Sequence, residues 1–113
     1  MRSDMLSAVI QEFDLHTVMY IGEDEEFLNS LTQSVDRPLE SPGDNDADVV
    51  FLDQYGDDPN QAISVGFGKT KEGGFLMGSG YNHETKEIQY AVAEAFNLAL
   101  VQIGPESVWC VRK

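Results

Sequence analysis

The stretch predicted to organise the fold is residues 83–103, HETKEIQYAVAEAFNLALVQI. Its apolar residues recur at offsets of four, seven, eight, eleven and fifteen, which is the spacing of one helical face; they are Ile88, Val92, Ala95, Phe96, Ala99 and Ile103. Asn82 suits the N-cap of such a helix, and Gly104 followed by Pro105 suits its end. We therefore expect a long C-terminal helix, at about 83–103, packed centrally in the core.

Two further helices are predicted nearer the N-terminus. Apolar residues at helical spacing favour one helix from Ser3 to about Leu15. A second helix is expected to open at Asp24 and to close before Pro38, because the residue that precedes a proline is biased away from helical geometry. The chain is therefore expected to hold three helices.

Strand signals fill the remaining segments. The apolar run 47–52 is typical of a buried strand, and the β-forming run 17–21 is compatible with a short one. Alternation over 63–67 predicts a half-buried strand that forms a hairpin with 75–80. Residues 108–112 are expected to form a final strand beside that hairpin. The predicted fold class is α+β, a single domain over 1–113 with an antiparallel sheet of about four strands.

Negative charge is the compositional extreme of this chain, which has a formal net charge of −13 at pH 7. Residues 23–58 hold twelve acids against one base, Arg37, so these 36 residues carry −11 of that charge. Such a concentration disfavours nucleic acid or an anionic membrane as a direct partner and favours a basic protein. The candidate partner-binding residues are Glu23, Asp24, Glu25, Glu26, Asp36, Glu40, Asp44, Asp46, Asp48, Asp53, Asp57 and Asp58.

Part of this acidic stretch has the spacing of a charged row. Alternate residues of an extended segment point the same way about 6.6 Å apart, so Asp44, Asp46 and Asp48 are expected to display negative charge at about two phosphate steps of a duplex. The run 23–26 has a second explanation, since carboxylates are favoured at a helix N-terminus. Simple solubility also explains acidity, and adaptation to high salt is disfavoured because the excess is local.

Two ligand-binding motifs fail on their spacing. The sequence Gly-Lys-Thr beginning at Gly68 resembles the end of a phosphate loop, but Ile63 occupies the position of the first glycine. The acids that start at Asp44 are spaced like half of a calcium loop, but Val49 replaces its glycine and Tyr55 its bidentate glutamate. We therefore expect no cofactor and no metal.

The cysteine and histidine content gives no catalytic pattern. Cys110 lies in an apolar context, where a cysteine is normally a small core residue, and a single cysteine fits a reducing cytoplasm. His16 and His83 lack metal-ligand spacing, and no nucleophile stands in a recognisable motif. The longest apolar block, 98–101, is far shorter than a membrane span. We expect a cytoplasmic protein that is not an enzyme.

These observations favour a small non-catalytic inhibitor that binds the basic nucleic-acid-binding surface of a partner protein or complex. In charge and size alone, the chain is similar to phage-borne nucleic-acid mimics of the anti-restriction or anti-CRISPR type. Two alternatives remain open: an immunity or antitoxin-like protein that caps a toxin, and a general acidic protein-interaction domain. The sequence does not define the oligomeric state.

Overall fold

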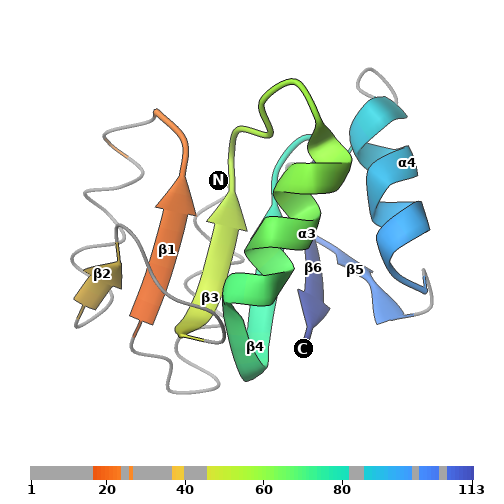
Figure 1. Cartoon of the computed structure of the whole chain (residues 1–113). Coiled ribbons are helices and arrows are strands. Elements are labelled where there is room, and N and C mark those ends of the chain that lie inside the picture. The colour runs from red at the N-terminus through yellow and green to blue at the C-terminus, as the bar shows by residue number, and fades with distance from the viewer. Residues whose placement is uncertain are drawn as a thin grey trace.

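The structure, a computed structural model, describes residues 17–23, 26, 37–39, 46–81, 86–97, 100–104 and 107–113. Within these residues it contains a mixed six-stranded sheet and two helices (Figure 1). The strands lie in the order β2-β1-β3-β4-β6-β5. Along the chain the elements are β1 (Thr17–Ile21), β2 (Arg37–Leu39), β3 (Ala47–Leu52), α3 (Pro59–Lys69), β4 (Thr70–Gly78), α4 (Lys86–Ala95), β5 (Gln102–Ile103) and β6 (Trp109–Arg112).

Strand β3 lies inside the sheet and is buried on both faces. Its last four residues are all 0% exposed. It runs parallel to β1, with Val50 opposite Met19, and parallel to β4, with Val50 opposite Leu76. A continuous apolar run is the usual sequence of a strand in a parallel sheet that is covered on both sides. The strands predicted at 47–52 and 17–21 are confirmed.

The strand predicted at 63–67 is wrong, because these residues form the centre of helix α3. Ile63 and Gly66 are the buried residues of this helix, and their separation of three places them on one helical face. The intervening Ser64 and Val65 are exposed. The segment is therefore buried along one face of a helix. The alternation of its apolar residues, which predicted a strand, does not correspond to alternating burial in the structure.

Helix α3 has defined signals at both ends. The carboxylate of Asp58 accepts a hydrogen bond from the backbone N–H of Gln61 at 3.2 Å, and Pro59 occupies the first turn. Both are strong N-terminal signals, because the cap satisfies a free amide and proline lacks one. At the other end, Thr70 donates from its hydroxyl to the Gly66 carbonyl at 2.8 Å.

The predicted antiparallel sheet of about four strands is also wrong, because α3 connects β3 to β4 as a crossover. A helix between neighbouring strands returns the chain to the edge where the first strand began, so the two strands run parallel. Strand β2 is likewise parallel to β1. The antiparallel part of the described sheet lies at β6, which pairs with β4 and β5. The strand predicted at 108–112 does lie beside 75–78, with Leu76 opposite Val111.

The predicted central helix at about 83–103 is wrong in its extent. Helix α4 spans ten residues, and its buried face is formed by Ile88, Ala91 and Val92. Further along the chain, Gln102 and Ile103 form the short strand β5, where Ile103 is 51% exposed. The pairing of Ile103 with Trp109 in the sheet replaces helical continuation. The helix predicted at 3–15 lies outside the described residues. The one predicted from Asp24 does so too, except at Glu26, which is helical, and Arg37, which begins β2. Apart from Glu26, the described residues hold two helices, where three were predicted.

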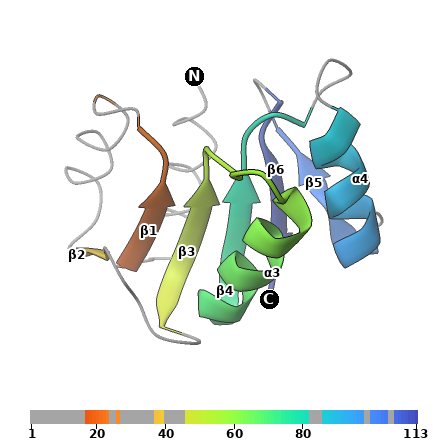
Figure 2. The ribbon, with the colours of Figure 1, turned by 45° about the horizontal axis from the view of Figure 1, so that its top comes forward.

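The sheet buries apolar side chains on both faces. Helices α3 and α4 lie on the same face (Figure 2), where Ile63 and Val92 pack in one cluster with Leu76 and Trp109. The opposite face buries a second cluster, which contains Val18, Val49, Phe51, Phe75, Met77, Val108 and Cys110. Burial on two faces is the reason that β3 tolerates no polar side chain in its last four positions.

Alanine substitutions at two glycines test this packing, because they are expected to change the free energy of unfolding in opposite directions. A Cβ at Gly78 would collide with the Tyr55 hydroxyl and the Trp109 indole, whereas a Cβ at Gly68, near the end of α3, would meet nothing within 4 Å. We expect Gly78→Ala to lower the free energy of unfolding by about 1–3 kcal/mol through overpacking. Gly68→Ala should raise it by about 0.5–1 kcal/mol, because alanine loses less backbone entropy in a helix. Urea unfolding of both variants measures the difference, and an equal effect on stability would contradict the packing described.

Candidate functional site

The carboxyl ends of β1, β3 and β4 meet at one edge of the sheet, called here the carboxyl edge (Figure 1). It is formed by residues 22–23, 53–58 and 79–81, which follow these three strands. Helix α3 also begins there, directly after Asp58. Ligands and partners of open parallel sheets bind most often at this edge, because the connecting loops are free to vary there.

Asp53 ties the three strands together at the carboxyl edge. One carboxylate oxygen accepts a hydrogen bond from the Tyr20 hydroxyl at 2.6 Å, and the other accepts one from the Ser79 hydroxyl at 2.8 Å. The backbone adds a bond from the Asp53 N–H to the Ile21 carbonyl at 2.8 Å. Asp53 was predicted as a partner-binding residue, but its half-buried carboxylate serves the fold.

Tyr55 extends this network into the core. Its hydroxyl donates to the Ser79 carbonyl at 2.6 Å and accepts from the indole N–H of Trp109 at 2.9 Å. Burial raises the pKa of Tyr55 strongly; the Trp109 hydrogen bond lowers it and the charge of Asp53 raises it further. The phenol therefore remains protonated and acts as a structural donor.

Three predicted partner-binding residues are exposed on the carboxyl edge: Glu23, Asp57 and Asp58. Asp58 also caps α3. Glu26 is exposed a few residues after β1. Gly56, in the middle of the loop 53–58, has a φ of 68°, a left-handed conformation that favours glycine and turns the chain sharply between Tyr55 and Asp57.

The acids around the start of β3 lie at the opposite edge. Asp46 is exposed, but Asp48 is half-buried and exchanges two hydrogen bonds with Thr17, at 2.8 and 3.1 Å. The predicted row of free carboxylates is therefore wrong at Asp48, whose side chain fixes β1 against β3. The structure separates this group from the carboxyl edge by the length of a six-residue strand. The remaining predicted residues, Asp24, Glu25, Asp36, Glu40 and Asp44, lie outside the described residues.

Most of the described basic side chains lie away from the carboxyl edge. Lys69 and Lys71 flank the junction of α3 and β4, at the amino end of the parallel strands. Lys113 lies nearby, since its ammonium donates to the Phe67 carbonyl near the end of α3 at 2.9 Å. At the carboxyl edge, Lys86 begins α4. The sequence alone did not predict this separation of charge, because it becomes visible only once the strand directions are known.

Two hollows flank the loop 53–58. One of about 550 Å³ is lined by Asp53, Asp57 and Glu87, and another of about 480 Å³ by Asp57, Asp58 and Gln61. Residues 54–57 border both hollows and so form a ridge between them. The ridge carries Asp57 and is flanked by Asp53 and Asp58, and it is called here the acidic ridge. Glu87 was not predicted, because its position beside the loop depends on the return of the chain through β4.

Neither metal-binding residues nor similarity to known proteins assigns a function to the carboxyl edge. Over the ranges that the structure describes, no group of three or more His, Cys, Asp or Glu residues is placed to hold a metal ion. His16 and His83 lie outside those ranges. A scan against models of known protein families matches none of them to this chain, and a search among curated proteins finds no match. Neither of the two described helices is long and apolar enough to cross a membrane.

The buried thiol and phenol predict a loss of stability in alkali. Burial raises the pKa of Cys110 from 9.0 to about 12, and the pKa of Tyr55 is raised as well. Between these values the native state holds protons that the unfolded chain releases, so the free energy of unfolding should fall as the pH rises above about 9. Urea unfolding across this range measures the fall, and Cys110→Ala should make it shallower. A profile that is flat up to about pH 11 would contradict the burial of both groups.

Proposed function

We propose that the protein is a non-catalytic inhibitor whose carboxyl edge binds the basic nucleic-acid-binding surface of a partner protein or complex. The observation that supports it is the uneven distribution of charge on the described surface. Glu23, Asp57 and Asp58 are exposed at the carboxyl edge beside one base, Lys86, whereas at the opposite edge Lys69 and Lys71 offset the exposed acids Asp46 and Glu72. Such an arrangement steers a basic partner toward one end of the molecule and gives the complex an orientation.

The proposal places the protein in the cytoplasm, where enzymes that handle nucleic acids act. It assigns no reaction to the carboxyl edge. The carboxylate of Asp53 accepts bonds from two hydroxyl groups, and the raised pKa of Tyr55 keeps its proton in place. These groups hold the ridge of residues 54–57 in one geometry, which reduces the entropy lost on binding.

A second candidate is an immunity or antitoxin-like protein that caps the basic active site of a toxin. The observation that favours it is the ridge between two hollows at the carboxyl edge. A convex acidic ridge fits a concave site better than it fits an open groove that follows a duplex. The nature of the inhibited partner separates the two candidates: a toxin in one case, and a nucleic-acid-handling effector in the other.

Charge reversal tests the proposed edge. Asp57→Lys changes an exposed acid on the ridge, and Glu72→Lys makes the same change at an exposed residue near the amino end of β4. With a partner captured from nuclease-treated lysate, we expect Asp57→Lys to slow association by about tenfold or more at low salt, and Glu72→Lys to have a much smaller effect. The difference should shrink as the salt concentration rises.

The same preparation tests displacement of nucleic acid. If the edge takes the place of phosphates, a fluorescent duplex bound to the partner should be released as the protein is added. A ternary complex that keeps the duplex would contradict the proposal, and so would equal association rates for Asp57→Lys and Glu72→Lys.

A further inference from the structure

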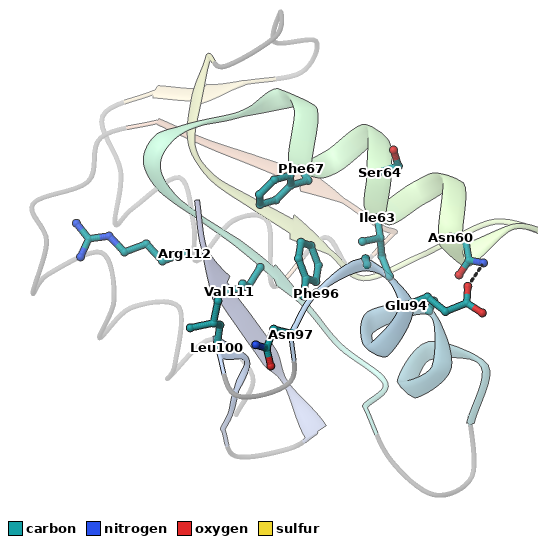
Figure 3. A pocket seen from close by; sticks show the side chains of 12 residues that line it. Asn60, Ile63, Ser64, Phe67, Glu94, Phe96, Asn97, Leu100, Val111 and Arg112 are labelled. Atoms are coloured by element: carbon teal, nitrogen blue, oxygen red, sulfur yellow. Dashed lines mark hydrogen bonds between the residues drawn. The ribbon is translucent and has the colours of Figure 1, made fainter.

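A second surface lies away from the carboxyl edge, between α3, α4 and β6 (Figure 3). It is a pocket of about 610 Å³, within the range of ligand and anchor sites in proteins. Its walls are mainly apolar and include Ile63, Phe67, Phe96, Leu100 and Val111. None of these side chains was predicted as functional, because the helix predicted at 83–103 would have buried Phe96 in the core.

Two aromatic side chains, Phe67 and Phe96, line this pocket. The ring centroids of Phe67 and Phe96 are 5.1 Å apart, and Phe96 in turn contacts Trp109, with centroids 6.3 Å apart. Leu100 stands at the rim and is 68% exposed. A large apolar side chain that is exposed beside an apolar hollow is a common feature of protein-binding surfaces.

The pocket carries an acidic side chain at the end that the start of α3 forms. There Glu94 accepts a hydrogen bond from the side-chain amide of Asn60 at 3.0 Å (Figure 3). Arg112 also borders the pocket, but its guanidinium lies 5.5 Å from the ring centroid of Phe75, a residue of the cluster on the other face of the sheet. Near the end of α3, the Lys113 ammonium lies 5.0 Å from the ring centroid of Phe67.

We propose that this pocket receives a large apolar side chain of the basic partner, with a neighbouring Lys or Arg of that partner beside Glu94. This inference rests on the proposed function, since it takes the partner to be a basic protein. Charge complementarity determines how the partner is oriented in the pocket. Its cation lies at the Glu94 end, because Lys113 would repel it at the other end. Such an apolar anchor with a charged neighbour is the usual composition of an interface hot spot.

A peptide probe tests the pocket without the partner. The probe is a short capped peptide that carries a tryptophan next to a pair of lysines, added to the whole isotope-labelled protein and followed by NMR. We expect saturable shifts at Phe67, Phe96 and Leu100. A matched peptide with alanine in place of tryptophan should bind about tenfold more weakly or not at all, and so should one with glutamates in place of the lysines.

Two pairs of variants separate the pocket from general effects. Ser64→Trp should fill the pocket and weaken the probe by about tenfold, whereas Ala93→Trp, on α4 but lining neither this pocket nor the hollows at the carboxyl edge, should not. Glu94→Lys should weaken the lysine probe more than Glu72→Lys does. Ser64 and Ala93 are both exposed, so the fold should survive each substitution.

The outcomes distinguish this inference from the proposed function. Shifts confined to Glu23 and Asp57, unaffected by Ser64→Trp, would overturn the pocket and leave the acidic edge standing. Shifts at the pocket that Ser64→Trp removes, together with partner binding that is indifferent to Asp57→Lys, would support the pocket and overturn the acidic edge. Absence of any saturable shift would overturn the inference.

Discussion

The burial of β3 between two parallel neighbours is the constraint on which the rest of this structure depends. The last four side chains of the strand are fully buried, so both faces of the sheet must be covered and both edges of the strand must be paired. The pairing with β4 requires a crossover, and α3 supplies it. This crossover brings the loop 53–58 and the end of β4 to one edge. The acidic ridge is therefore a consequence of the strand direction.

Hydrogen bonds divide the described acids into two kinds. Asp53 and Asp48 have bonds that hold neighbouring strands together, and Asp58 caps a helix. These carboxylates are components of the fold. The number of acids in the sequence therefore overstates the negative charge that is available to a partner. Glu23, Asp57 and also the cap residue Asp58 are exposed at the carboxyl edge. Acidity in this chain thus has a structural part and a surface part, and only the second supports the proposed function.

Much of the strand content was predictable from the sequence, while the topology was not. The apolar run of β3 and the β-forming run of β1 have one simple interpretation, and both were found. The segment 63–67 has two possible interpretations. Its apolar residues alternate as in a strand, and Ile63 and Gly66 also share one face of a helix. Asp58 and Pro59, just before this segment, are the cap and first turn of a helix, a signal that the predicted hairpin does not take into account. Interpreting 63–67 as a strand led to the prediction of a hairpin, where the structure has a parallel crossover. The candidate site was predicted only as a set of acids, since its separation into two edges follows from the strand direction.

The most direct test of this account is the pairing partner of β4, measured from nuclear Overhauser contacts between backbone protons in the isotope-labelled protein. The parallel register predicts contacts between Val50 and Leu76, and between Leu52 and Gly78, together with sequential helical contacts through Ile63 and Val65. Cross-strand contacts between residues 63–67 and 75–78 would show a hairpin instead. That result would contradict the crossover, and with it the position of the acidic ridge at the carboxyl edge.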